Sequence, residues 1–334
     1  MKEVFEQLAA REDLNEVQMQ QVFEDILEGS VSQAQIAAFL LGLKIKGETA
    51  SEITGIVKAL KTHTRQLPQT FDDAMCNCGT GGDQSYSFNI STTVSFILAA
   101  AGIRVAKAGN RSISSKAGSA DVLEALGINV AAEPHVLAKA LNQVGLAFIF
   151  AQTMHPAMRY IGPARQELGI PTIMNLVGPL ANPLDLETQL MGLYRPELQE
   201  TAALVMHKLG RRRAVVITGP DNMDEAALYG INTYTLLDKG RISQGTFNYQ
   251  DLQMEKVELQ AIKGGDAEEN ARILLSVLQN EASPYLETSV LNAGLAFYAN
   301  GKAVSIKDGV LLARQLIAEG QALAKLRQLQ EVQV

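Results

Sequence analysis

Hydrophobic positions in the first sixty-odd residues follow a helical period. Behind Thr49, four apolar residues fall at i, i+3, i+4 and i+7 of one helical face: Ile53, Ile56, Val57 and Leu60. Thr49 and Glu52 form a capping-box pattern at the start of this helix. Residues 32–46 show a similar pattern and stop at Gly47, a residue that favours helix termination. These patterns predict an all-helical N-terminal domain.

From about residue 71, short apolar runs alternate with helical stretches. The apolar runs cover residues 74–78, 103–106, 147–151 and 214–218. The helical stretches cover residues 94–101, 122–126 and 198–209. Strands that alternate with helices predict an α/β domain with a mainly parallel central sheet. A glycine- and proline-rich stretch, residues 178–183, interrupts the pattern, and we expect it to return the chain to the helical part.

Composition narrows the functional classes. The 334 residues are 47% hydrophobic and carry a net charge of -7 without a basic stripe, which argues against general nucleic-acid binding. No apolar run is long enough to span a bilayer and the N-terminus lacks a signal core, so we expect a cytoplasmic protein. Cys76 and Cys78 lack a second pair or a nearby histidine, which favours two inert thiols on a strand over a metal site.

The first candidate site is a glycine-rich loop between a predicted strand and a helix. It reads Gly-Thr-Gly-Gly-Asp over residues 79–83 and continues as Phe-Asn-Ile-Ser-Thr-Thr over residues 88–93. Such a loop points successive N–H groups at a phosphate, and the following helix N-terminus adds positive potential. The alternative is a plain turn with Ser91 as helix cap. The spacing matches neither a Walker A loop nor a dinucleotide-binding fingerprint.

A second loop, residues 107–119, also lies between a predicted strand and a helix. It contains three cations, four serines and two glycines, with Ser119 included, which suits a second anion site. Its alternative is a solvated serine-rich loop. Two such loops in equivalent positions favour phosphate binding over two coincidental turns.

Two further blocks carry charged side chains. Arg165 could hold a carboxylate through its planar guanidinium, or could simply pair with a nearby glutamate. Asp224 and Glu225 follow a predicted strand and suit Mg²⁺, with helix capping by acids as the alternative. The run of three arginines at 211–213 follows a helix, and we interpret it as a solvated run rather than a phosphate site.

Taken together, these blocks resemble the anthranilate phosphoribosyltransferase family. The resemblance covers the whole chain and rests on CGTGGD, FNIST, GNRSISSKAGSADVLEALG, HPAMRYIGPARQELG, NLVGPLANP and the Asp224-Glu225 pair. It implies a fold like that of nucleoside phosphorylases and phosphoribosyltransferases. The helical domain would comprise residues 1–70, completed by about 165–190, and the catalytic α/β domain residues 71–164 and 191–334. Homodimerisation through the helical part is also implied.

The resemblance further implies roles for individual residues, with anthranilate and phosphoribosyl pyrophosphate as substrates and Mg²⁺ as cofactor. Phosphoribosyl pyrophosphate would be held by Gly79, Gly82, Asp83, Ser87, Asn89, Ile90, Ser91, Thr92, Lys107, Ala108, Gly109, Asn110, Arg111, Ser112, Ile113, Ser114, Ser115 and Ser119. Anthranilate would be bound by Gly79, Asn110 and Arg165. The metal would be served by Ser91, Asp224 and Glu225. Catalysis would depend on Asp83, Lys107, Asn110 and Arg165.

Three positions depart from the family pattern. Ala108 stands where the family loop usually has histidine, Pro171 where it often has arginine, and Thr218 where histidine is frequent. A histidine at 108 could contact anthranilate or manage the amine proton, so its absence predicts slower turnover without affecting phosphate and metal binding. The other two departures are expected to matter less.

Two other functions compete with this interpretation. A pyrimidine-nucleoside phosphorylase resembles the family in fold, but it is longer and has an additional C-terminal domain. A relative that has lost catalysis could bind nucleic acid instead; only Ala108 favours this, and the net charge of -7 opposes it. A salt-dependent gel-shift assay separates a nucleic-acid binder from an enzyme.

Overall fold

The computed structural model describes residues 1–111 and 116–332. Residues 1–62 form four helices: α1 (Lys2–Ala9), α2 (Glu16–Leu27), α3 (Gln33–Lys46) and α4 (Ala50–Thr62). Capping boxes start α2, α3 and α4 at Asn15, Ser32 and Thr49, and α3 ends at Gly47. The predicted helical N-terminus is therefore confirmed, together with the Thr49–Glu52 box.

The described residues form one seven-stranded sheet in the order β3-β2-β1-β4-β5-β6-β7. The strands are β1 (Ala74–Gly79), β2 (Arg104–Gly109), β3 (Leu146–Phe150), β4 (Thr188–Gly192), β5 (Arg213–Thr218), β6 (Asn232–Asp238) and β7 (Arg241–Phe247). β1 to β5 pair in parallel, and β6 and β7 are antiparallel. This confirms the mainly parallel sheet.

Three strands, β4, β6 and β7, lie outside the apolar runs that predicted the others. β4 contains the polar Thr188 and Gln189, both fully buried. Gln189 can sit inside the protein because its Nε2 donates to the carbonyl of Pro179 at 2.7 Å. β7 is an edge strand with mostly exposed side chains. Their polar residues hid these strands from a search for apolar runs.

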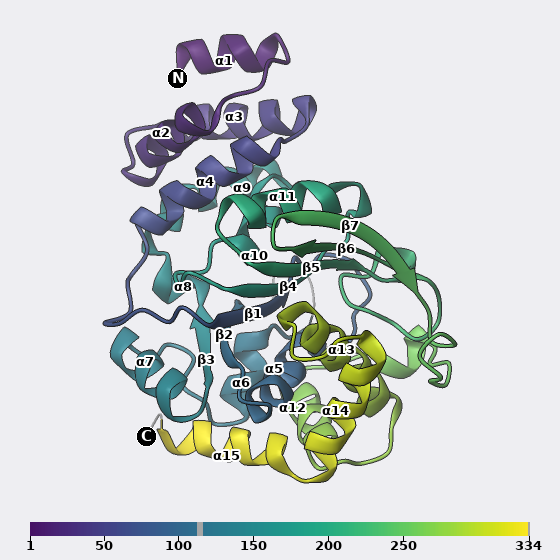
Figure 1. Cartoon of the computed structure of the whole chain (residues 1–334). Coiled ribbons are helices and arrows are strands. Elements are labelled where there is room, and N and C mark those ends of the chain that lie inside the picture. Colours follow the sequence, from purple (N-terminus) through teal and green to yellow (C-terminus); the bar gives the residue numbers. More distant parts are fainter. Residues whose placement is uncertain (112–115, 333–334) are drawn as a thin grey trace.

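Helices cover both faces of the sheet (Figure 1). The helices after α4 are α5 (Ile90–Ala100), α6 (Ser119–Ala125), α7 (Pro134–Gln143), α8 (Ala151–Met154), α9 (Gly162–Leu168), α10 (Met174–Leu180), α11 (Gln199–Lys208), α12 (Ala267–Leu278), α13 (Pro284–Asn300), α14 (Ile306–Ala318) and α15 (Gln321–Val332), with short 3₁₀ turns at Pro156–Tyr160, Pro196–Leu198, Pro220–Asn222 and Leu259–Ile262. Alternate residues of one strand enter different cores. Leu190 belongs to the hydrophobic cluster that contains residues of α5 and α13, whereas Met191 belongs to the one that contains residues of α4 and α11.

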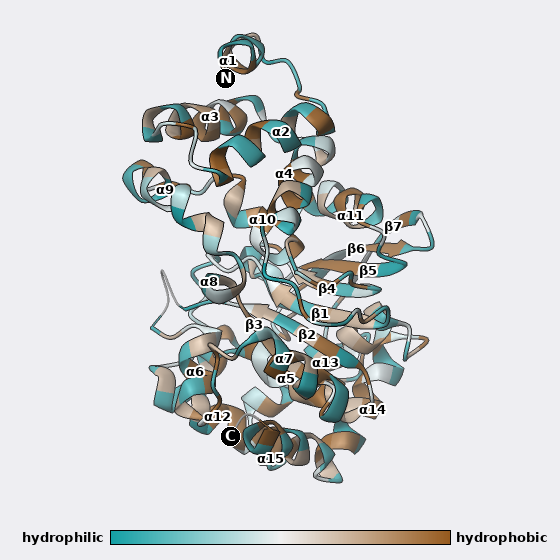
Figure 2. Cartoon of the chain, turned by 90° about the vertical axis from the view of Figure 1, so that its left-hand side faces the viewer, coloured by the Kyte–Doolittle hydropathy of each residue, from teal (hydrophilic) through white to brown (hydrophobic). Residues whose placement is uncertain are grey.

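The middle of the chain returns to the helical part. Ile161 and Ala164 around α9 and Val177 of α10 share a hydrophobic cluster with α2, α3 and α4. Figure 2 shows these helices stacked on one side of the sheet. The expectation that residues 178–183 bring the chain back is met by Leu180 and Ala181, which belong to the same cluster. The predicted domain limits themselves stay a prediction.

One arginine does not lie where the sequence predicted. Arg211 is 2% exposed, so the interpretation of residues 211–213 as a solvated run is wrong at this position. Its guanidinium donates to the carbonyl oxygens of Leu209 and Leu180 and to Gln189 Oε1. These carbonyl and amide partners explain how the cation is tolerated in the core.

Two further expectations concern the cysteines and membrane-spanning helices. Cys76 and Cys78 lie buried on β1 as free thiols, as the strand prediction implied. None of the helices in residues 1–111 and 116–332 has both the length and the apolar character needed to cross a bilayer.

Candidate active site at the carboxyl edge of the parallel strands

The glycine-rich loop and the acidic pair meet at one edge of the sheet. β1 and β5 flank β4 and run parallel to it, so their carboxyl ends emerge side by side. The backbone N–H of Gly81 donates to Asp224 Oδ2 at 2.6 Å, and the N–H of Asp224 donates to Asp83 Oδ2 at 3.2 Å. Two segments about 140 positions apart in the sequence thus form one acidic site.

Close backbone approach explains two of the glycines at this edge. A Cβ on Gly79 would lie 2.3 Å from Asp224 Oδ2, and one on Gly192 would lie 1.6 Å from the Asp224 carbonyl oxygen. Atoms cannot approach so closely, so any side chain at either position would displace the acidic pair. The glycines at the ends of β1 and β4 therefore let Asp224 reach the loop.

Burial and neighbouring negative charges raise the pKa values of Asp224 and Glu225. Burial raises the pKa of Asp224 well above its usual range, and the negative charge of Asp83 adds to the shift. Burial also raises the pKa of Glu225 to about 7, while the positive charge of Lys107 opposes that rise. Neighbouring carboxylates held in this way favour a bound cation, because it would offset both burial and mutual repulsion.

The start of α5 contributes donors and free polar atoms. The N–H of Ser91 donates to Glu225 Oε1 at 3.2 Å. The alternative with Ser91 as helix cap is wrong, because Asn89 occupies the N-cap position and its side chain makes no capping bond. Within the described residues, three buried oxygens here have no partner: Thr80 Oγ1, Asn89 Oδ1 and Thr92 Oγ1. Buried polar atoms are usually paired, so these indicate a ligand site.

The second loop begins at the end of β2. Lys107 is 4% exposed and donates to the carbonyl of Ala108 at 3.0 Å. Ser119 Oγ, at the start of α6, donates to the carbonyl oxygen of Asn110 at 3.2 Å. The positive charge of Lys107 acts on Glu225, where it opposes the rise in pKa that burial causes. The expected phosphate-binding residues Ser112, Ile113, Ser114 and Ser115 lie outside the described residues.

Arg111 takes ion-pair partners on α6 in this structure. Its guanidinium contacts Asp121 at 2.8 Å and Glu124 at 2.6 Å, and it lies 5.7 Å above the ring of Phe150. The side chain remains partly exposed, so these pairs are individually weak. A substrate role for Arg111 stays a prediction.

Arg165 lies on α9 and is half-buried, and its side chain has no ion pair or hydrogen bond among residues 1–111 and 116–332. Burial lowers the pKa of its guanidinium, which is the sign of a cation lacking an anionic partner. The alternative of a structural pair with glutamate is therefore not formed. An unpaired, partly buried guanidinium suits a carboxylate ligand.

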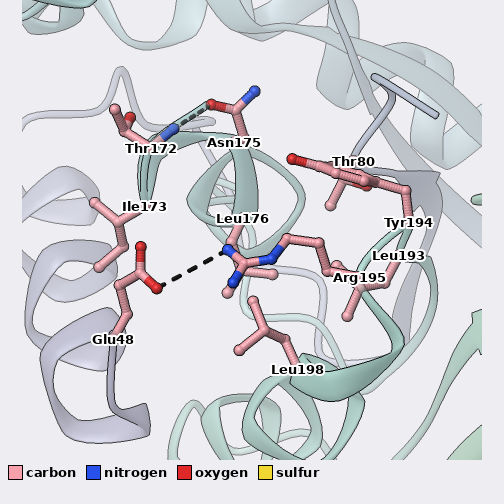
Figure 3. Close-up of a pocket in the computed structure, with 10 residues that line it drawn as sticks. All are labelled: Glu48, Thr80, Thr172, Ile173, Asn175, Leu176, Leu193, Tyr194, Arg195 and Leu198. Atoms are coloured by element: carbon pink, nitrogen blue, oxygen red, sulfur yellow. Dashed lines mark hydrogen bonds and ion pairs between the residues drawn. The ribbon is translucent and has the colours of Figure 1, made fainter. Parts of the chain in front are cut away.

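A cleft separates the glycine-rich loop from the helical part (Figure 3). It encloses about 280 Å³ of space, part of it open to solvent. Thr80 and Tyr194 line one wall, and Glu48, from the connection between α3 and α4, faces them with Arg195 reaching across. Arg195 Nη1 lies 4.0 Å from Glu48 Oε2. The site thus has a side wall that comes from the helical part.

The carboxylates of this site suit a magnesium ion whose remaining ligands come from substrate and water. Among the described residues, no group of three or more His, Cys, Asp and Glu side chains could hold a metal alone. Mg²⁺ needs no such group, since it usually takes one or two carboxylates and leaves other positions to phosphate oxygens and water. Asp224 and Glu225, with raised pKa values and Ser91 beside them, meet this requirement.

Two asparagines that the sequence patterns did not single out fix the backbone beside the site. Asn292 on α13 donates to the carbonyl of Ala226 and accepts its N–H, which fixes the chain just after Glu225. Asn77 on β1 donates to the carbonyl of Ser91 at 2.8 Å. Both are asparagines in otherwise apolar segments, and this isolation was the signal available in the sequence.

A second missed segment is residues 262–265, which pairs with the first loop. The N–H of Phe88 donates to the carbonyl of Ile262, and the N–H of Gly264 donates to that of Tyr86. Ser87 and Lys263 form an isolated antiparallel bridge between these bonds. The segment therefore sets the path of the loop that carries Ser87.

Comparisons with known proteins agree with this geometry. Residues 72–323 match the model of the glycosyl transferase family α/β domain, and residues 2–64 match that of the family's helical bundle domain. Anthranilate phosphoribosyltransferase from Streptococcus thermophilus is 76% identical over 334 residues, and the match covers all of both chains. The chain belongs to the anthranilate phosphoribosyltransferase family. The resemblance drawn from the sequence blocks is confirmed.

Other members of the anthranilate phosphoribosyltransferase family extend the likeness. The protein from Streptococcus mutans is 65% identical over 334 residues, again covering both chains fully. The solved structure from Thermus thermophilus shares 35% identity with a TM-score of 0.92, covering 98% of each chain. The Saccharomyces cerevisiae enzyme, solved in complex with phosphoribosyl pyrophosphate and Mg, shares 22% identity with a TM-score of 0.89, covering 99% of this chain and 96% of that one. The yeast likeness supports the fold.

Proposed function

We propose that this chain transfers the phosphoribosyl group of phosphoribosyl pyrophosphate to the amine of anthranilate. The products are N-(5-phosphoribosyl)anthranilate and pyrophosphate, in a step of tryptophan biosynthesis. The observation that carries the proposal is the contact of Asp224 and Glu225 with the N–H groups of Gly81 and Ser91. It joins the acidic pair to the glycine-rich loop and the start of α5, and full-length identity of 76% to a named family member supports the assignment.

The first loop and α5 would bind the sugar diphosphate. Thr80, Asn89 and Thr92 offer buried oxygens without partners, and the loop offers backbone N–H groups. The buried ammonium of Lys107 adds fixed positive charge close to Glu225. As the bond from the anomeric carbon to pyrophosphate breaks, negative charge collects on the leaving group, and pre-arranged donors stabilise that charge.

The acidic pair would hold Mg²⁺ together with Ser91 and substrate oxygens. When bound, the ion supplies positive charge that stabilises the departing pyrophosphate. Asp224 and Glu225 each accept a backbone N–H, and a bound cation would favour their charged forms against the burial that raises their pKa values. The helix and loop amides fix the direction of both carboxylates.

Arg165 and Asn110 would bind anthranilate near Gly79. The guanidinium of Arg165 is free to take the carboxylate in two parallel hydrogen bonds. A fixed carboxylate would direct the aryl amine toward the anomeric carbon, and correct placement of two reactants is itself a large catalytic contribution. Because the substrate carries its own nucleophile, no covalent enzyme intermediate is required.

We also propose a cytoplasmic homodimer formed through the helical part. Leu41 and Ile45 on α3 are 39% and 63% exposed, and they are four residues apart on one helical face. An apolar pair on the outer helices is suited to contact with a second copy. A dimer of this kind leaves the edge of the sheet open to substrates.

The test follows anthranilate fluorescence in the presence of phosphoribosyl pyrophosphate. We expect the signal to fall with MgCl₂ and to persist when the metal is removed with EDTA. Glu225→Gln should lower kcat/KM by about 10²-fold or more, the size typical of losing one group that stabilises transition-state charge. Glu255→Gln, at an exposed carboxylate outside the site, is the matched control. Full activity with EDTA, or an unaffected Glu225→Gln, would refute the metal assignment.

A further inference from the structure

The ends of β2 and β3 bring Gln152 to the side chain of Asn110. The two strands are parallel, and their last residues, Gly109 and Phe150, are register partners. The chain therefore leaves both strands at the same edge, into Asn110 on one side and into α8 on the other (Figure 1). There, Gln152 Nε2 donates to Asn110 Oδ1 at 3.3 Å.

The backbone determines which way the Asn110 carboxamide faces. The N–H of Arg111 can only donate, and it lies 2.8 Å from Asn110 Oδ1. That atom is therefore the oxygen, and Gln152 must present its own nitrogen to it. Two donors on the oxygen leave the Asn110 amide nitrogen as the free end. Residues 1–111 and 116–332 provide no acceptor for its two N–H groups.

We infer that Gln152 is a positioning residue, which acts through Asn110 to fix a donor for the aromatic substrate. The inference rests on the proposed function, in which Asn110 binds anthranilate. A free amide N–H pair attracts the carboxylate of anthranilate, whereas a carboxamide rotated by half a turn would present its oxygen and repel it. Gln152 supplies one of the two hydrogen bonds that oppose this rotation.

The hydrogen bond from Gln152 is expected to affect anthranilate binding more than phosphoribosyl pyrophosphate binding. The resemblance assigns Asn110 to both substrates, but phosphoribosyl pyrophosphate would be bound mainly by the first loop, α5 and Lys107, and Gln152 contacts none of these through a hydrogen bond. Loss of the Gln152 bond should therefore weaken anthranilate binding most. A net hydrogen bond corresponds to a change of about two- to tenfold in an equilibrium constant.

The experiment measures both Michaelis constants and thermal stability for Gln152→Ala in the full-length protein. We expect KM for anthranilate to rise about two- to tenfold, with a clearly smaller rise in KM for phosphoribosyl pyrophosphate and no change in Tm. Gln152→Glu should have the larger effect, because a carboxylate cannot donate to Asn110 and repels the substrate carboxylate. Gln69→Ala is the matched control, since Gln69 Nε2 donates to Asn142 Oδ1 at 3.1 Å in an exposed pair of the same chemistry outside the site.

A double-mutant cycle separates positioning from a structural role. In an Asn110→Ala background, Gln152→Ala should add no further rise in KM for anthranilate. An equal rise in that background, a parallel rise in both KM values, or no change in the single variant would each overturn the inference. If the unaltered protein fails to consume anthranilate, the proposed function itself fails. If the unaltered protein consumes anthranilate and Gln152→Ala has the same KM values, only the positioning role fails.

Discussion

Ala108 occupies the position in β2 where the family loop usually carries histidine. The residue is half-buried, pairs with Ile149 of β3, and directly precedes Gly109 and Asn110. A side chain at 108 therefore emerges beside the segment assigned to anthranilate. The phosphate and metal residues depend on other contacts, chiefly those of Gly81 and Ser91 with the acidic pair.

Ala108→His should raise kcat/KM for anthranilate. An imidazole there could contact the substrate or help move the amine proton, and general acid–base assistance is typically worth about 10²–10⁴-fold where it is complete. The variant's KM for phosphoribosyl pyrophosphate should stay the same. Steady-state fluorescence assays measure both quantities. An unchanged or lower kcat/KM would show that the missing imidazole has no part in this enzyme.

His155 should make stability depend on pH in a defined window. Its Nδ1 lies 2.8 Å from Thr64 Oγ1, and burial lowers its pKa to about 4 from the usual 6.5. Between these values the unfolded chain binds more protons than the folded one, so stability is lost as pH falls from 6.5 toward 4. The free energy of unfolding that His155 contributes in this way is roughly 3 kcal/mol at most.

The check is the pH dependence of Tm for His155→Asn and for the unaltered protein. The variant cannot take up this proton, so its Tm should fall less between pH 7 and pH 4.5. Both proteins share every other titrating group, which makes the difference of the two curves the relevant quantity. Parallel curves would mean that His155 is not held neutral by burial.

At the scale of elements, the site depends on a loop held from two sides. Asp224 and Glu225 contact its two ends through Gly81 and Ser91, and residues 262–264 pair with its middle. The second contact needs a glycine. A Cβ on Gly264 would lie 2.8 Å from the Cα of Phe88, a backbone atom that cannot move without shifting the loop.

Gly264→Ala should therefore raise KM for phosphoribosyl pyrophosphate and lower stability. Overpacking of this kind typically costs about 1–3 kcal/mol of stability. The loop would also shift, and Ser87 and Asn89 would shift with it. Gly42→Ala on α3 serves as control, because its Cβ would meet only the flexible side chain of Leu8 at 3.2 Å. Wild-type KM for this substrate in Gly264→Ala would show that the pairing with residues 262–264 does not position the loop.

At the scale of the whole molecule, the sheet is buried on both faces and the helical part lies against one of them. Helices α1 to α4 lie on one side of the sheet (Figure 1), and α3 exposes Leu41 and Ile45. The same helical part supplies Glu48 to the cleft beside Thr80. Association through α3 would thus hold one wall of the cleft without covering the site.

Ile45→Glu should shift the protein from dimer to monomer. A charge in the centre of an apolar contact must be desolvated without a partner, which is strongly unfavourable. Size-exclusion chromatography with light scattering reports the mass directly. Val304→Glu is the control, because Val304 is 89% exposed and lies between α13 and α14, whose buried residues belong to a different hydrophobic cluster from those of α3. A monomer before substitution, or a dimer after it, would contradict association through this helix.

The sequence alone determined those features that depend on residues close together in the chain. Thr49 and Glu52 form their capping box across three positions, and the apolar runs of β1, β2, β3 and β5 form strands because each is bounded by turn residues. The glycine-rich loop likewise shows its chemistry in its own residues. The family could therefore be identified without a structure.

Tertiary structure decided everything that depends on a distant partner. Arg211 was expected in a solvated run, and Gln189 lies in a strand that the apolar pattern did not reveal. Both are buried, and each donates to a carbonyl group of α10. The pairing of Gln152 with Asn110 arises only from the register of two parallel strands. Hydrogen bonds between residues far apart in the chain leave no periodicity in the sequence, and only the folded backbone brings their partners together.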